Sequence, residues 1–99
     1  MEIKVLEEGT PYTFALVGRL DTNTSPLLDE FAKKLYAKGL NDIAVDMAEC
    51  AFVSSAGLRV IVAMQKTAAK GGTLVFRNVQ PEVMDVFDMT GFTNILTFE

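Results

Sequence analysis

The hydrophobic and polar positions of the chain alternate first with the period of a strand and then with the period of a helix. Two short alternating runs come first, Ile3–Leu6 and Tyr12–Gly18, and a turn containing Gly9 and Pro11 separates them. Two β-prone runs joined by a tight turn predict an antiparallel hairpin.

Helical spacing follows from Ser25 to Gly39. Ser25 is a favoured N-terminal cap, Pro26 suits the first helical position, and Gly39 is typical of a helix end. One face of this helix carries an apolar stripe, formed by Leu27, Leu28, Phe31 and Leu35.

Strand and helix patterns then alternate to the end of the chain. We predict a buried strand at Asp42–Met47, a helix from Leu58 to about Lys70, a strand at Thr73–Phe76, a helix from Pro81 that ends before Gly91, and a weak strand at Asn94–Phe98. The predicted order is ββαβαβαβ in a single α/β domain over residues 1–99. Such alternation implies a mixed, mostly parallel sheet with an antiparallel first strand and with helices packed against it.

The predicted second helix has a wider apolar face than one contact surface needs, because Val60, Ala63 and Met64 extend it. One interpretation is that a neighbouring helix covers these residues, since methionine is a common core residue. The other is a partly exposed apolar strip on which a partner docks.

Composition narrows the function classes. The chain has a net charge of −4 without a basic cluster, which argues against nucleic acid or an anionic membrane as a partner. It has one cysteine, Cys50, and no histidine, so an internal disulfide and a Cys–His pair are impossible within it. We expect no metal and no cofactor.

No apolar run approaches the roughly 20 residues of a membrane span and the N-terminus lacks a signal-peptide pattern, so we predict a cytoplasmic protein.

Two predicted loops follow strands at their carboxyl ends, where α/β sheets carry their functional residues. They are Leu20–Ser25 and Ala51–Gly57. In the second loop, Ser54 and Ser55 precede a helix, so one can cap it while the other presents its hydroxyl to solvent. The helix N-terminus would partly compensate a phosphoryl group on that hydroxyl. The alternative is that both serines only cap the helix.

The sequence contains few residues or motifs that could support enzymatic chemistry. It contains no histidine, no metal-ligand spacing and no glycine-rich phosphate loop. Asp21 and Asp46 each fall near the carboxyl end of a predicted strand and could in principle act as an acid–base pair. We expect a binding protein, with a small enzyme or a nucleotide-binding role as the alternatives.

Three segments resemble the motifs of one family, the STAS domains of bacterial anti-sigma factor antagonists. Phe52–Leu58 is similar to the family's phosphorylation motif, which reads Phe, an aliphatic residue, Asp, Ser, Ser or Thr, Gly, Leu. Gly18–Thr24 is similar to its Gly-x-Leu-Asp-x-x-Thr loop, and Phe87–Phe92 resembles its Phe-x-x-Thr/Ser-Gly-Leu segment. With the order of elements, the resemblance covers essentially the whole chain.

The resemblance implies partner switching. An unphosphorylated antagonist binds an anti-sigma factor, which is often also a serine kinase, and thereby frees the sigma factor. Phosphorylation releases the antagonist, and a phosphatase resets it. The family's phosphoacceptor falls on Ser55, whereas Asp21, Thr24, Ser54 and Gly57 fall on the partner- and nucleotide-linked loops.

The sequence departs from the family's pattern at two positions. Ser54 stands where the family usually has Asp, and Ala56 stands where it has Ser or Thr. The first change removes a carboxylate beside the acceptor and makes Ser54 a competing acceptor. The departures motivate an alternative function, a STAS adaptor that is never phosphorylated and that serves in a transporter or sensory complex.

Overall fold

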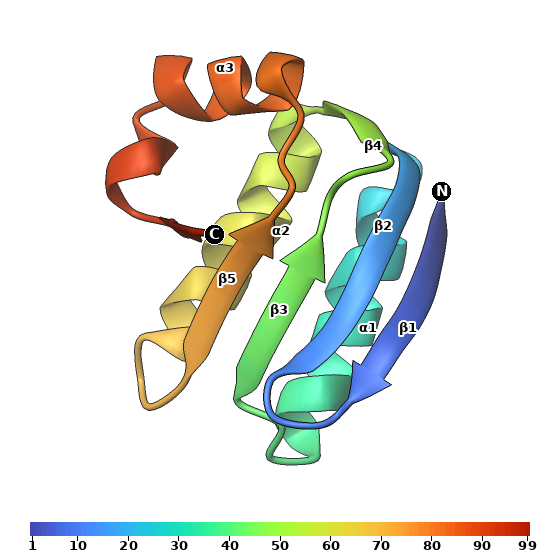
Figure 1. Cartoon of the computed structure of the whole chain (residues 1–99), viewed down its shortest axis with the longest axis vertical. Helices are drawn as coiled ribbons and strands as arrows, with labels where there is room; N and C mark the ends of the chain where they lie inside the picture. The colour runs from blue at the N-terminus through green and yellow to red at the C-terminus, as the bar shows by residue number, and fades with distance from the viewer.

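The computed structural model describes residues 1–99 and contains one six-stranded sheet, three α-helices and a short 3-10 helix, η1 (Figure 1). In chain order the elements are β1 (Glu2–Glu8), β2 (Tyr12–Leu20), α1 (Ser25–Ala37), β3 (Asp42–Asp46), β4 (Cys50–Val53), α2 (Ser55–Ala68), β5 (Thr73–Arg77), α3 (Pro81–Met89), η1 (Phe92–Asn94) and β6 (Thr97–Phe98). No helix has the length and apolar character that crossing a membrane requires.

The sheet has the strand order β1-β2-β3-β5-β6, and β4 pairs with the far end of β2. Only β1 and β2 pair antiparallel; every other pair is parallel. The predicted mixed sheet with an antiparallel first strand is therefore confirmed. Helices α1 and α2 cover one face of this sheet, and α3 crosses the end at which β3 and β5 finish (Figure 1).

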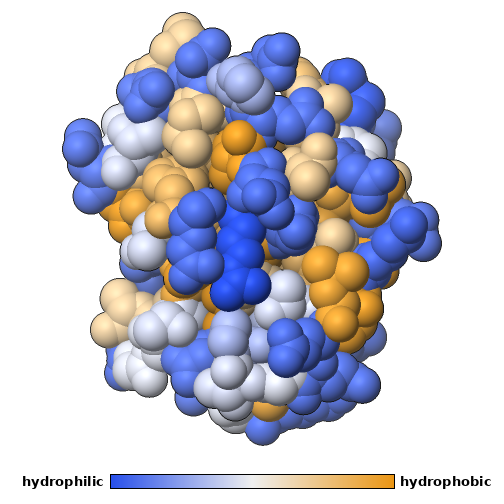
Figure 2. All heavy atoms as spheres, viewed as in Figure 1, coloured by the Kyte–Doolittle hydropathy of each residue, from blue (hydrophilic) through white to orange (hydrophobic).

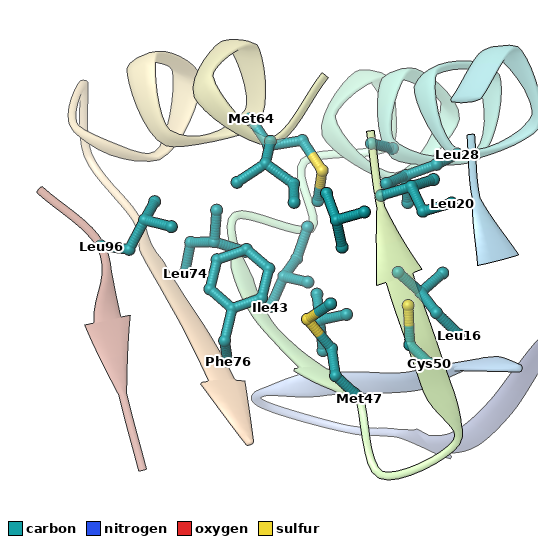
Figure 3. Close-up of a cluster of buried hydrophobic side chains, with 14 of the residues drawn as sticks. Leu16, Leu20, Leu28, Ile43, Met47, Cys50, Met64, Leu74, Phe76 and Leu96 are labelled. Carbon is teal, nitrogen blue, oxygen red and sulfur yellow. The ribbon is translucent and has the colours of Figure 1, made fainter. Parts of the chain in front are cut away.

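The core lies between the sheet and the two covering helices. Figure 3 shows side chains from β2, β3, β5, α1 and α2 pointing into one cluster, among them Leu20, Leu28 and Met64. Strand β3 is buried along Ile43–Val45 because it lies between β2 and β5. Its short apolar run is thus typical of an interior parallel strand.

The opposite face of the sheet is polar in its middle (Figure 2). Side chains on neighbouring strands pair across it: the Thr73 hydroxyl donates to Asp42 at 3.0 Å, and the Arg77 guanidinium donates to Glu99 at 2.7 Å. These exposed pairs satisfy the polar groups of the sheet but leave the apolar contacts to the helix-covered face.

The observed elements differ from the predicted ones at several points. The final strand β6 spans only Thr97–Phe98 rather than the predicted Asn94–Phe98, because Asn94 belongs to η1. Strand β4 was missed, because it has only four residues and pairs with the end of β2 rather than with its sequence neighbour β3. Helix α2 begins at Ser55, three residues before the predicted start. Thr24, not Ser25, occupies the N-cap position of α1, and the buried Ser25 hydroxyl donates to the carbonyl of Asp21.

Candidate functional site

Strand β4 brings the two loops that follow strand ends side by side. Because β4 runs parallel to the end of β2, Arg19 lies opposite Phe52 and Leu20 opposite Val53. The backbone N–H of Ser54 continues this ladder and donates to the carbonyl of Leu20 at 2.8 Å. The entry to α2 is therefore fixed directly beside the loop that begins at Asp21.

Ser54 is the N-cap residue of α2. Its backbone is extended (φ −88°, ψ 173°), and its Oγ accepts the N–H of Gly57 at 3.2 Å. A favoured cap thus satisfies one of the unpaired donors of the first helical turn. Of the two serines, Ser54 has the capping role.

Ser55, the first residue of α2, is exposed, and its hydroxyl has no hydrogen-bond partner within the chain. It lies at the positive end of the helix dipole, where an added anion is partly compensated. The Ser55 side chain therefore lies at the protein surface.

Gly57 allows α2 to approach the end of β2. A Cβ atom at this position would lie 2.7 Å from Cγ of Leu20 and 3.0 Å from its carbonyl oxygen. The first distance is shorter than real Cβ contacts and the second is tight, so a side chain here would require Leu20 to shift, and the motif's glycine allows the close packing that positions Ser54 and Ser55.

The Asp21–Thr24 loop is closed by its own hydrogen bonds. Oδ1 of Asp21 accepts the N–H groups of Asn23 and Thr24 at 3.0 and 3.1 Å. In return Oγ1 of Thr24 accepts the N–H of Asp21 at 2.8 Å and donates to the carbonyl of Arg19 at 2.7 Å. The backbone N–H of Thr24, supported by its hydroxyl, the N–H of Asn23 and the Arg19 charge, lowers the pKa of Asp21 against the opposing effect of partial burial. The loop therefore presents a preformed carboxylate next to α2.

Arg19 and Phe52 form a stacked pair that the sequence analysis missed. The Arg19 guanidinium lies 4.1 Å from the centroid of the Phe52 ring, and both side chains are exposed. Their pairing follows from the register of β2 and β4, so only recognition of β4 could have revealed it.

Asp21 and Asp46 do not form an acid–base pair. Asp46 lies opposite Ala15 on β2, and Asp21 follows six residues later, roughly 20 Å along an extended strand. The Asp46 carboxylate instead accepts the N–H of Ala48 at 2.9 Å and the amide of Asn78 at 3.1 Å.

A surface groove lies beside Ser55, between α2 and η1, with a volume of about 450 Å³. We call it the α2–η1 groove; it is lined by Ser55, Leu58, Arg59, Val62, Ala63, Lys66 and Phe92. Gly91 adopts a left-handed conformation (φ 78°) that turns the chain after α3 and positions Phe92 over α2. The Thr90 hydroxyl donates to the carbonyl of Val86 at 2.8 Å, so the third motif ends α3 and forms one side of the groove.

The wide apolar face on α2 is covered in one part and open to the surface in another, and docking of a partner on the open part stays a prediction. Met64 is buried, and its carbonyl accepts the hydroxyl of Tyr36 on α1 at 3.2 Å. Val62 and Ala63 instead line the groove.

The architecture and the three motifs define a STAS domain, and the family model for that domain matches residues 2–99: the chain belongs to this family. Among curated relatives, BtrV of Bordetella bronchiseptica, named as a candidate anti-sigma factor antagonist, is 36% identical over 59 residues, which are 59% of this chain and about half (51%) of that protein. The anti-sigma-B factor antagonist of Bacillus subtilis is 29% identical over 82 residues, 82% of this chain and 74% of that protein.

Solved structures share the fold. The Bacillus anti-sigma factor antagonist SpoIIAA matches in its unphosphorylated form with a TM-score of 0.77 at 15% identity, covering 99% of this chain and 87% of SpoIIAA. Its phosphorylated form matches with a TM-score of 0.76 at 16% identity, covering 99% and 91%. The chain therefore has the fold that SpoIIAA has in both states.

Proposed function

We propose that this chain is an anti-sigma factor antagonist that acts in the cytoplasm by binding rather than by catalysis. It binds an anti-sigma factor through the surface around Ser55, a serine kinase, often the anti-sigma factor itself, phosphorylates Ser55, and the complex separates. A phosphatase then restores the binding form. Family membership and the names of the relatives support this role.

The observation that carries the proposal is the different environment of two adjacent serines. The Ser54 oxygen caps α2, whereas the Ser55 hydroxyl is exposed and free of internal partners. A kinase can transfer the γ-phosphoryl group of ATP to Ser55 Oγ, with loss of the hydroxyl proton and release of ADP, while the cap stays intact. These two environments support Ser55 as the acceptor and a structural role for the competing acceptor Ser54.

The charge of phosphoserine explains release without refolding. A phosphoserine carries about −1.5 to −2 charges at pH 7 and would need to be desolvated inside an interface. A penalty of about 4 kcal/mol weakens binding roughly a thousandfold. The near-equal match of this fold to phosphorylated and unphosphorylated SpoIIAA supports a switch that acts through added charge.

One observation favours a second function. Ser54 keeps the capping role of an N-cap residue but offers no carboxylate to orient the neighbouring hydroxyl. A STAS adaptor of a transporter or sensory complex would need no such group. Intact mass of the protein from its native cell separates the two functions, because a species heavier by about 80 Da, one phosphoryl group, contradicts the adaptor.

The test begins with tagged wild-type protein used to capture its partner from native lysate, followed by identification of that partner. The purified partner is then titrated with Ser55→Asp and Ser55→Ala proteins and incubated with labelled ATP. We expect Ser55→Asp to abolish binding and Ser55→Ala to bind normally without incorporating phosphate. Undiminished labelling of Ser55→Ala would move the acceptor to Ser54 or Thr24, and a partner unrelated to sigma-factor regulation would refute the function.

A further inference from the structure

We propose that the α2–η1 groove binds an acidic, apolar segment of the partner protein and that Arg59 and Lys66 select it. The proposal rests on the proposed function for the existence of a partner. It adds the chemistry of the segment that the partner inserts and the residues that recognise it.

The floor of the groove supplies the apolar part of the contact. Four of its seven lining residues are hydrophobic, and they come from two elements, α2 and η1. Leu58 is largely buried beneath the groove, whereas Val62 and Phe92 are partly exposed along it. Aliphatic side chains of a bound segment would remove this surface from water, which stabilises the complex by roughly 25 cal/mol per Å² before the cost of association.

The charges along the groove give it a sign opposite to that of the whole protein. The chain carries a net charge of −4, yet α2 contains Arg59 and Lys66 and no acidic residue. The three ion pairs of the structure are Arg19–Asp21, Lys33–Asp29 and Arg77–Glu99. Arg59 and Lys66 are exposed and take part in none of them, so both charges are available to a partner.

The spacing of the two cations restricts the occupant. Arg59 and Lys66 are seven residues apart on one helix, which places them about 10.5 Å apart along its axis. Two carboxylates on a helical segment, also seven residues apart, would match them. Two cations on an acidic protein are too few for nucleic acid, whose binding needs many phosphate contacts, so an acidic polypeptide is the occupant the charges favour.

The groove also connects the recognition of the acidic segment to the proposed phosphorylation of Ser55. Ser55 precedes Arg59 by one helical turn, and residues four apart lie on the same face of a helix. A phosphate on Ser55 would attract the Arg59 guanidinium and repel the partner's carboxylate at the same place. One modification would thus both add a charge to the groove and occupy its cation.

Charge reversal tests the proposal with the partner captured above. Arg59→Glu and Lys66→Glu should each weaken binding about tenfold and should reduce the dependence of the association rate on salt. Lys70→Glu is the matched control, because Lys70 follows the last turn of α2 outside the groove and should change affinity less than twofold. If both groove variants bind like wild type while Ser55→Asp still fails to bind, the groove proposal is overturned and the proposed function stands.

Synthetic peptides test the groove without any natural partner. Two fluorescein-labelled helical peptides have the same leucine-bearing face and differ at two positions beside it, which are seven residues apart. One peptide has Glu at both positions and the other has Lys at both. We expect the Glu peptide to bind wild type at least tenfold more tightly than the Lys peptide does and to shift the amide NMR signals of Val62 and Phe92. On the Arg59→Glu, Lys66→Glu double variant, we expect the Lys peptide to bind more tightly than the Glu peptide. Equal binding, absent binding, or shifts confined to another surface overturn the proposal.

A second copy of the chain is the competing occupant, since α3 carries three acidic residues, Glu82, Asp85 and Asp88, and the 87% exposed Met89. Light scattering over a concentration series detects self-association. A dimer that Arg59→Glu dissociates would assign the groove to the chain itself and overturn the proposal, whereas a monomer supports a foreign segment.

Discussion

Ser54 and Ser55 are adjacent in the chain but belong to two regions with different physical properties. The inner region, around Ser54, Leu20 and Gly57, is closely packed, and its polar groups pair with one another. The outer region, from Ser55 along Arg59 to Lys66, is exposed and has no internal ion pair. The comparison indicates that the inner region stabilises the fold and positions the outer region, which is left free to bind.

The largest expected effect is at Leu20, in the inner region. Leu20, the last residue of β2, is fully buried against α2, so Leu20→Ala should lower the free energy of unfolding by about 2–5 kcal/mol through lost burial and a cavity. Urea unfolding followed by circular dichroism measures the change. A loss below about 1 kcal/mol would mean that the inner region is not the tightly packed one.

Gly57→Ala sharpens the same prediction. The added methyl group overlaps Leu20 in the wild type and should cost about 1–3 kcal/mol. In the Leu20→Ala background part of that overlap disappears, so the second substitution should cost less than it does alone. Additive costs in this double-mutant cycle would show that the two residues do not contact each other in the way described.

Most of the fold could be predicted from the sequence because each helix and each long strand has a clear period and a Gly or Pro at its boundaries. Strand β4 lacks both signals: Cys50–Val53 is too short to show a period, and its partner at Gly18–Leu20 is about 30 residues earlier in the chain. The pairing that aligns the two functional loops was therefore invisible, although both loops were identified.

The geometry of the candidate site also depends on pairing between distant segments, which the sequence pattern does not reveal. The sequence placed two serines at a helix N-terminus but left open which one caps it, since that depends on the register of β4 with β2. The groove could not be predicted, because Phe92 reaches α2 only through the turn at Gly91. Periodicity identifies elements, whereas surfaces formed by distant elements need their packing.

A matched pair of substitutions, one at each serine, gives the next largest effect on the free energy of unfolding. The pair tests the difference between the inner and outer regions directly. Ser54→Ala removes the cap on the N–H of Gly57 and should cost about 1 kcal/mol of unfolding free energy. Ser55→Ala, one residue further, removes an exposed hydroxyl and should stay within about 0.5 kcal/mol of wild type. Ser54→Asp keeps an acceptor at the cap and should restore the stability lost in Ser54→Ala. Equal costs at the two serines would contradict the division into two regions.

The smallest expected effect on the free energy of unfolding concerns the Asp21–Thr24 loop, which borders both regions. This effect depends on pH. The N–H of Thr24 and the other donors around Asp21 lower the pKa of this carboxyl from 3.8, so the folded state favours its charged form. The stabilisation is fully present above pH 3.8, the unfolded value, and is lost as the pH falls through the lower folded value. The difference in unfolding free energy between wild type and Asp21→Asn should therefore be constant near neutral pH and should shrink below pH 3.8.

Denaturant unfolding of both proteins between neutral pH and about pH 2.5 measures this difference, and carbon NMR titration of the Asp21 carboxyl measures its pKa directly. Asp85→Asn, which removes an exposed carboxylate on α3, controls for the loss of one surface charge. A difference that grows on acidification would show that the loop destabilises the charged form. The hydrogen bonds to the Asp21 carboxylate would then contribute no net stability to the folded state.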